Sequence, residues 1–197
     1  MHLFIEILTL LFFLACAAHA AATRGRTGAA FFAAMLLLGF LRENFVTVRD
    51  LLYGFGPLHL MFGRAPLIAA IIWGYSIYAA VVWTETVSGE RLEDRRPSLR
   101  FLARTALFMI ALACFYEPFL ALLHMARWQP GTRSTLGVPW ITWIGYPTLA
   151  VLFLLLWGWA LERRTVAGRA AALLIPLPLL AFGHAWGLQA VKTAFGW

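Results

Sequence analysis

The sequence predicts an all-α protein integral to a membrane, a polytopic transmembrane helical bundle of about six crossings that forms one domain over residues 1–197. Hydrophobic residues make up 62% of the 197-residue chain and charged residues 13%, against roughly 45–50% and 25% in soluble domains. Several apolar runs approach the roughly 20 residues that a helix needs to cross the hydrocarbon core. No linker and no internal repeat is evident along the chain.

Hydropathy places six apolar helices. The first lacks a basic start, and Arg24 and Arg26 come after it, so a retained transmembrane helix is favoured over a cleaved signal peptide. The last third of the second helix must accommodate Arg42, Glu43 and Asn44. The expected helices are 3–22, 28–48, 66–84, 101–123, 140–161 and 170–191.

The segment 51–63 is apolar but too short for an ordinary crossing. Its 13 residues are interrupted by glycine and proline, which favours a re-entrant or interfacial segment on the non-cytoplasmic side. A full crossing here would raise the count to seven and change the topology.

Basic residues orient this bundle and do not indicate nucleic-acid binding. The net charge is +7 and nearly all basic residues are Arg, but they fall in short clusters between apolar runs, as topology signals and lipid-headgroup contacts do. The first, third and fifth connections carry ten Arg residues, and the second and fourth carry five. The positive-inside rule therefore puts both termini on the non-cytoplasmic side of a cytoplasmic membrane of bacterial type.

Three ionisable residues share one depth in this topology. Glu43, Glu117 and His184 lie roughly 20–26 Å along their helices from the cytoplasmic arginines, and Glu6 on the first helix also falls toward the outer side. An ionisable side chain inside a membrane costs at least about 2.5–3.5 kcal/mol, so it indicates function. We expect at least one carboxyl to keep its proton and to act as a proton donor. The alternative is structural ion pairing of Glu43 with Arg42 or Arg49, and of Glu117 with Arg127.

Two long loops frame that level, 43–66 and 116–140. Each begins at a carboxylate, passes a histidine (His59, His124), and ends in a glycine–proline element before the next helix. Glycine permits a tight turn and proline preorganises helix entry. Functional residues commonly occupy loops held by a rigid scaffold.

Aromatic residues are abundant near the outer end, where Trp128, Trp140 and Trp143 cluster. An interfacial aromatic belt is the simplest interpretation. Aromatic faces beside a proton donor also suit a pocket that stabilises a carbocation by cation–π attraction.

The sequence gives little support for a metal site or a phosphate-binding site. His59, His124 and His184 lack the spacing of di-iron membrane enzymes, which leaves only a site assembled from distant segments. Cys16 and Cys114 lie in apolar runs and are expected to be buried small hydrophobes. No GxSxG elbow, glycine-rich phosphate loop or DDxxD motif is present.

The two loops resemble a family of membrane carotenoid-biosynthesis proteins, which includes bacterioruberin-pathway hydratases and carotenoid 1,2-hydratases of the CruF type. The resemblance covers about residues 43–146. Its residues are Glu43, the segment 53–57, Gly63 to Pro66, Glu117–Pro118, Trp128, "GVPWIT" at 137–142, and Gly145–Tyr146. Glu117 stands where the family has Asp, Thr142 where it has Asn, and Tyr146 where it has Trp.

What the resemblance implies is water addition to, or cyclisation of, an isoprenoid olefin without a redox cofactor or metal. A carboxylic acid protonates a C=C bond, and aromatic and carboxylate groups hold the tertiary cation until water or an internal alkene captures it. Either carboxylate can be the donor. The expected catalytic residues are Glu43, Glu117, Asp50, His59 and Tyr116. The expected substrate-binding residues are Asn44, Tyr53, Trp128, Trp140, Trp143 and His184.

Two other classes stay open. One is a non-enzymatic lipid or isoprenoid carrier or transporter component, in which the carboxylates serve proton movement and the short chain works as a homo-oligomer or with a partner. The absence of an evident inverted repeat argues against it. The other is a membrane oxidoreductase that uses the histidines to hold a metal.

Overall fold

The computed structural model describes residues 2–49, 52–93 and 96–197, with the side chains of 46–49 left out. The prediction of an all-α fold is confirmed. The helices are α1 (His2–Arg49), α2 (Leu67–Ser88), α3 (Leu99–Leu122), α4 (Trp140–Leu161), α5 (Val166–Leu174) and α6 (Pro176–Phe195). Within the described residues, five helical stretches are long and apolar enough to cross a membrane: His2–Phe45, α2, α3, α4 and the run Val166–Phe195.

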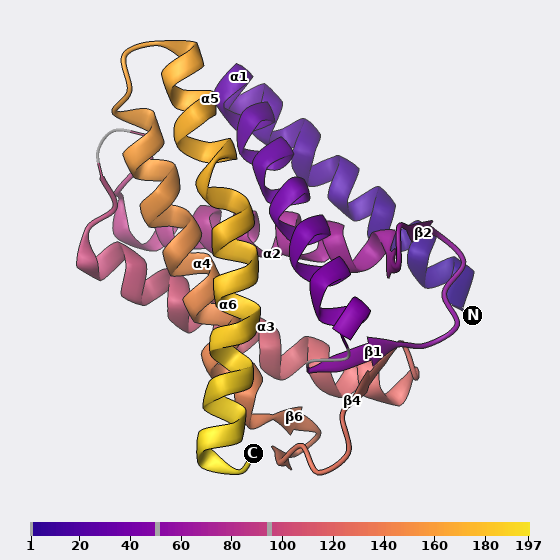
Figure 1. Ribbon diagram of the computed structural model, residues 1–197. Helices are drawn as coiled ribbons and strands as arrows, with labels where there is room; N and C mark the ends of the chain where they lie inside the picture. Colours follow the sequence, from indigo (N-terminus) through magenta and orange to yellow (C-terminus); the bar gives the residue numbers. More distant parts are fainter. Residues whose placement is uncertain (1, 50–51, 94–95) are drawn as a thin grey trace.

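Helix α1 folds back on itself at Gly25. That residue has φ 56° and ψ −135°, outside the helical region, a conformation that glycine adopts without a steric penalty. The rings of Phe13 and Phe32 lie 5.4 Å apart, whereas a straight helix would separate these residues by roughly 28 Å. Helix α1 is therefore a hairpin of two helices (Figure 1), close to the expected helices at 3–22 and 28–48.

The last expected helix, 170–191, is longer than predicted and is divided. Helix α5 begins at Val166, where the Thr165 hydroxyl accepts from the Gly168 N–H, and α6 ends at Phe195 before a left-handed Gly196. The two helices meet at Ile175, directly before Pro176. Because proline donates no backbone hydrogen bond, the helical ladder is interrupted there.

Six short strands occupy one end of the bundle. Strand β1 (Tyr53–Phe55) pairs antiparallel with β4 (Ala126–Trp128). Strands β2 (Met61–Phe62) and β3 (Ala65–Pro66) form one hairpin, and β5 (Ser134–Thr135) and β6 (Val138–Pro139) form another. The described part of segment 51–63 is thus strand and loop and contains no helix. The β1–β4 pair joins the two long loops, which are far apart in the sequence.

The fold contains an internal repeat that the sequence does not reveal. The second half of α1, β1, β2, β3 and α2 recur in the same order as α3, β4, β5, β6 and α4, and each boundary recurs 73 residues later. The helix ends lie at 49 and 122, the first strands begin at 53 and 126, and the next helices begin at 67 and 140. Few positions are identical, among them Pro57/Pro130 and Pro66/Pro139, so the expectation of a chain without a repeat was wrong.

Equivalent residues of the two units meet in the middle of the molecule. Gly54 lies opposite Arg127, its counterpart, in the β1–β4 pair. The rings of Trp73 and Tyr146, also counterparts, lie 4.9 Å apart. Contacts between counterparts are what a local twofold axis produces. Because both units enter the strand region from the same side, the repeat is of the parallel type.

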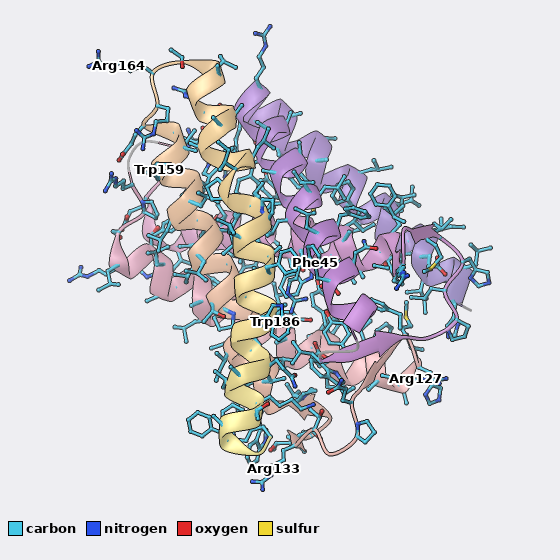
Figure 2. The ribbon with its side chains drawn as sticks, viewed as in Figure 1. Phe45, Arg127, Arg133, Trp159, Arg164 and Trp186 are labelled. Carbon is cyan, nitrogen blue, oxygen red and sulfur yellow. The ribbon has the colours of Figure 1, made fainter. Side chains whose placement is uncertain are left out.

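The two ends of the bundle differ in their arginines and loops. Figure 2 shows Arg164 at the end opposite the strands, and Arg127 and Arg133 at the strand end. Ion pairs stabilise the first of these ends: Arg24 lies 2.5 Å from Glu85 and 3.6 Å from Glu93, and Arg96 pairs with Glu162. The N-terminus lies near β2 and the C-terminus near β6 (Figure 1), so both termini lie toward the strand end.

Candidate functional site

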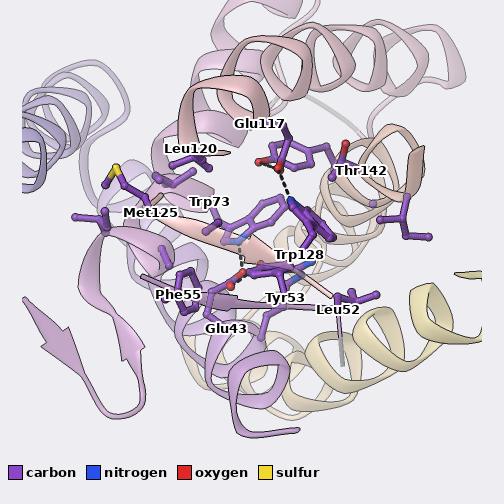
Figure 3. Close-up of a pocket in the computed structure, with 18 of the residues that line it drawn as sticks. Glu43, Leu52, Tyr53, Phe55, Trp73, Glu117, Leu120, Met125, Trp128 and Thr142 are labelled. Atoms are coloured by element: carbon purple, nitrogen blue, oxygen red, sulfur yellow. Dashed lines mark hydrogen bonds and ion pairs between the residues drawn. The ribbon is translucent and has the colours of Figure 1, made fainter. Parts of the chain in front are cut away.

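A pocket lies at the strand end, where both repeat units converge. Helices α1, α2, α3, α4 and α6 and strands β1 and β4 all contribute to its walls, which are mostly apolar. Its polar lining includes two carboxylates, Glu43 and Glu117, which are 1% and 4% exposed. The cavity is narrow, with a volume of about 50 Å³. Figure 3 shows Glu43 and Glu117 on opposite walls of one pocket, with Trp73 between them.

Glu43 accepts hydrogen bonds on both of its carboxylate oxygens. The indole N–H of Trp73 donates to Oε1 at 2.6 Å, and the hydroxyl of Tyr53 donates to Oε2 at 2.6 Å. The guanidinium of Arg42 donates to Oε1 and forms an ion pair with the carboxylate. The structural ion pair that the sequence offered as an alternative is therefore present at Glu43.

Arg42 is held in place from several directions. Its Nη1 donates to the Tyr53 hydroxyl at 2.8 Å, and its Nε donates to Nδ1 of His184 at 3.3 Å. Its guanidinium carbon lies 4.6 Å from the centre of the Trp73 ring, a cation–π contact. Because arginine only donates, His184 accepts at Nδ1, and its Nε2 proton is directed at the Gly145 carbonyl, 3.0 Å away.

Glu117 has a different environment. Trp128 donates from Nε1 to Oε2 at 3.1 Å, and the Tyr146 hydroxyl lies 2.9 Å from Oε1. Glu117 forms no ion pair with any residue that the structure describes, so the predicted pair with Arg127 is absent. Pro118 does not end the helix, because α3 continues to Leu122. Glu117 is thus buried against two neutral donors.

The β1–β4 pair forms one wall of the pocket. Side chains alternate across a strand, and Tyr53, Phe55, Ala126 and Trp128 all line the cavity, whereas Arg127 is exposed. Burial holds the pKa of the Tyr53 hydroxyl well above its ordinary value. Tyr53 therefore remains a proton-bearing donor to Glu43 over the physiological pH range.

The N-terminal helix anchors the first loop above this pocket. The carboxylate of Glu6, fully buried, accepts from the backbone N–H groups of His59 and Leu60 and from the His59 ring at 2.6–3.1 Å. The ring nitrogens of His2 lie 3.1 Å from the Pro57 carbonyl and 2.9 Å from the Leu123 carbonyl. Both loops are thus fixed by residues outside the repeat units.

Of the residues predicted from the sequence, the structure brings four into this pocket. These are Glu43, Glu117, Tyr53 and Trp128. His184 lies behind the pocket wall and holds Arg42. Asp50 lies outside the described residues.

The other predicted residues lie elsewhere. His59 is exposed and bonds Glu6, and Asn44 bonds the backbone of the β2–β3 hairpin. Tyr116 packs its ring against Tyr75 and Phe115. Trp140 donates to the Thr135 hydroxyl, and Trp143 is 41% exposed. Asn44 and Tyr116 lie away from the pocket because residues adjacent in a helix point about 100° apart, and their neighbours Glu43 and Glu117 face it. Among the described residues, no three His, Cys, Asp or Glu side chains gather as a metal site would require.

Sequence reasoning did not assign three residues of the pocket to the site. Arg42 was considered only as an ion-pair partner, Tyr146 only as a family counterpart, and Trp73 not at all. Trp73 and Tyr146 each follow the proline that begins their helix by seven residues, Pro66 and Pro139. That shared spacing is the signal that could have identified them. Comparison with protein-family models, curated proteins and solved structures found no match to this chain.

Proposed function

We propose that this chain is an integral-membrane enzyme that protonates a C=C bond of an isoprenoid olefin and adds water to the resulting cation. The observation that carries the proposal is the pair of buried carboxylates, Glu43 and Glu117, in one aromatic-walled pocket. Further support comes from the resemblance, because nine of the residues on which it rests line this pocket: Glu43, Tyr53, Phe55, Glu117, Trp128, Ile141, Thr142, Gly145 and Tyr146.

In its membrane the chain crosses six times, with both termini outside a cytoplasmic membrane of bacterial type. The fold-back of α1 at Gly25 supports six crossings over five, because it divides a 44-residue apolar stretch into two spans. The end opposite the strands carries Arg24, Arg96 and Arg164 and faces the cytoplasm. An apolar substrate then reaches the pocket from the bilayer.

The reaction moves one proton and one water molecule. A carboxylic acid O–H bond breaks as a C–H bond forms at the less substituted olefin carbon, which leaves a tertiary carbocation. Trp73, Tyr146, Tyr53 and Trp128 present ring faces and dipoles that stabilise this cation. Water adds to the cation, and the proton that it loses returns to the carboxylate, so the acid is regenerated and no redox partner is needed.

Hydration is the simpler of the two outcomes that the resemblance implies. Capture of the cation by water needs no folding of the substrate into a ring inside the pocket, whereas cyclisation does.

The test is turnover in labelled water. The purified protein is incubated with acyclic isoprenoid olefins in deuterated water or in ¹⁸O-labelled water, and the products are analysed by mass spectrometry. The expected product is an alcohol that carries one solvent deuterium on carbon and one solvent oxygen. Glu43→Gln and Glu117→Gln should each lower the rate at least 100-fold, and the exposed Glu162→Gln should not. No product across the olefin panel, from protein that unfolds cooperatively, would refute the proposal.

A proton-driven isoprenoid carrier is the second candidate, because the internal repeat favours it. Parallel repeats around a central site are one architecture of membrane transporters. In proteoliposomes, a carrier would move an unmodified isoprenoid together with protons, without forming a product. Recovery of chemically unchanged isoprenoid with proton uptake would therefore favour the carrier over the enzyme.

A further inference from the structure

The first repeat unit contains a buried guanidinium at a position where the second unit has an exposed aromatic ring. Arg42, 3% exposed, contacts Glu43 within the first unit. Its counterpart 73 residues later is Phe115, which is 68% exposed and points away from the pocket wall. One buried guanidinium therefore stands beside two buried carboxylates, and it pairs directly with only one of them.

The hydrogen bonds at Glu43 favour the ionised form. Trp73 Nε1 and Arg42 Nη1 both donate to Oε1, and neither atom can accept a proton from the carboxyl. The Tyr53 hydroxyl accepts from Arg42 Nη1 at 2.8 Å, so its own proton is directed at Oε2 of Glu43, 2.6 Å away. With a cation adjacent and donors on both oxygens, Glu43 is a carboxylate.

The hydrogen bonds at Glu117 accommodate the neutral acid. Trp128 can only donate, which makes Oε2 the carbonyl oxygen. The Tyr146 hydroxyl beside Oε1 both donates and accepts, so it can take a hydrogen bond from a protonated Oε1. An ionised Glu117 would lie buried with no cation in contact among the side chains that the structure describes, close to the negative Glu43, and burial of such a charge is strongly unfavourable.

We propose that Glu117 is the proton donor of this site and that Glu43, fixed by Arg42, is the permanent anion that faces the carbocation. The assignment rests on the proposed function for its catalytic half, but the protonation states stand on the hydrogen bonds alone. Glu117 gives its Oε1 proton to the olefin, becomes a carboxylate while the cation exists, and recovers a proton from the adding water. Arg42 and His184 are positioning residues.

Infrared spectroscopy of the resting protein tests the protonation states without a substrate. A protonated carboxyl has a C=O stretching band, separate from carboxylate bands, that shifts in deuterated water. We expect one such band at neutral pH, absent in Glu117→Gln and retained in Glu43→Gln and in the exposed control Glu162→Gln. A band lost in Glu43→Gln, or a spectrum with no carboxyl band, would overturn the assignment.

Arg42→Gln provides a second expectation. Without the guanidinium, Glu43 loses its ion-pair partner and a donor to Oε1, so its carboxylate bands should shift; an unchanged spectrum contradicts the role given to Arg42. Should Glu117→Gln fail to fold, Trp128→Phe and Tyr146→Phe replace it. Each alters a hydrogen bond of Glu117 and should shift the band, whereas Trp140→Phe, whose indole N–H bonds Thr135 outside the pocket, should leave its frequency unchanged.

Failure of the function and failure of the assignment give different results. A Glu117 carboxyl band in a protein that turns over no olefin supports the assignment and refutes the hydratase. Turnover that survives in Glu117→Gln but is lost in Glu43→Gln refutes the assignment and supports the hydratase. Both parts stand when Glu117→Gln loses the band and the solvent deuterium in the product together.

Discussion

Tyr53 and Trp128 pair across the β1–β4 sheet with ring centroids 4.8 Å apart, and each donates a hydrogen bond to a different buried carboxylate. The strands therefore do more than close the end of the bundle. Because one aromatic pair contacts both Glu43 and Glu117, the two long loops set the position of both carboxyl groups. If the two loops separated, each buried carboxyl group would lose a hydrogen-bond donor.

Replacement of Trp128 by Phe should destabilise the protein by about 1–3 kcal/mol, because it removes a donor from a buried carboxyl while keeping the aromatic bulk. Thermal unfolding in detergent measures the loss. Trp140→Phe is the control, since its indole N–H bonds the Thr135 hydroxyl near the surface, and it should cost less. Equal losses of stability in the two variants would show that the hydrogen bond to Glu117 contributes no more than the hydrogen bond to Thr135.

The pairing of the two loops depends on close backbone approach at Gly56. A Cβ atom at this position would lie 1.9 Å from the His124 carbonyl oxygen, and the Gly56 N–H donates to the Met125 carbonyl at 3.1 Å. Gly56→Ala should therefore separate β1 from β4 and destabilise the protein by more than about 2 kcal/mol. Gly183→Ala is the matched control, because no atom lies within 4 Å of its Cβ position and alanine favours helix. A Gly56→Ala protein as stable as Gly183→Ala would contradict the loop geometry.

How much of this site the sequence predicts depends on which interactions are local. Apolar runs of about 20 residues identified the helices, and intramembrane carboxylates identified Glu43 and Glu117, because both signals are contained in short windows. Trp73 is different: it reaches Glu43 only through the packing of α2 against α1. Its role is set by a contact 30 residues away in the chain, which no local pattern encodes.

Glu6 should control the opening of the first loop. Its carboxylate accepts from the N–H groups of His59 and Leu60, and hydrogen bonds to a charged group are worth about 1.5–3 kcal/mol. Glu6→Ala should lower the cost of opening by about 2 kcal/mol and speed tryptic cleavage after Arg64 about 30-fold. Mass spectrometry of the fragments gives the rate.

Cleavage after Arg133 in the second loop is the internal control for this experiment. That loop precedes the matching β5–β6 hairpin, and Glu6 bonds only the first loop within the described residues. Its cleavage rate should remain within about twofold of wild type. Parallel acceleration at both arginines would point to global unfolding and contradict a local anchor.

The internal repeat shows why the sequence alone concealed the symmetry of the site. Membrane helices exchange one apolar residue for another at little cost, so two units can share a backbone with few identities. The retained positions are those where the backbone is constrained: Pro66 and Pro139 directly precede the next helix in each unit. Gly54 and Arg127 share a place in the fold without any chemical likeness, because both point away from the pocket.

The ion pair between Arg96 and Glu162 should produce a small pH dependence at the end opposite the strands. The hydrogen bond that Glu162 accepts from Arg96 holds the pKa of the Glu162 carboxyl below its ordinary value. The stabilisation is therefore present above the unfolded pKa of about 4.3 and is lost as the pH falls through the lower folded value. Thermal unfolding of wild type and Glu162→Gln should differ near neutral pH and converge in acid. A difference that grows on acidification would reverse the sign and contradict the pair.

The turn of the β5–β6 hairpin has a leucine, Leu136, at a position whose backbone angles disfavour its side chain. Leu136 has φ 52° and is 91% exposed, and Gly137 beside it has φ 77°. Two positive φ angles in a two-residue hairpin are typical of a turn that favours Asn-Gly, and a branched apolar side chain is strained there. Leu136→Asn should therefore stabilise the protein by about 0.5–1 kcal/mol and raise its melting temperature, whereas Leu136→Val should lower it because a β-branched residue tolerates positive φ least.

The equivalent turn begins at Gly63, with φ 71°, so Gly63→Asn should change stability less than Gly63→Val. If Leu136→Asn melts below wild type, Leu136 does not occupy a left-handed turn in solution, and the pairing of β5 with β6 needs another explanation.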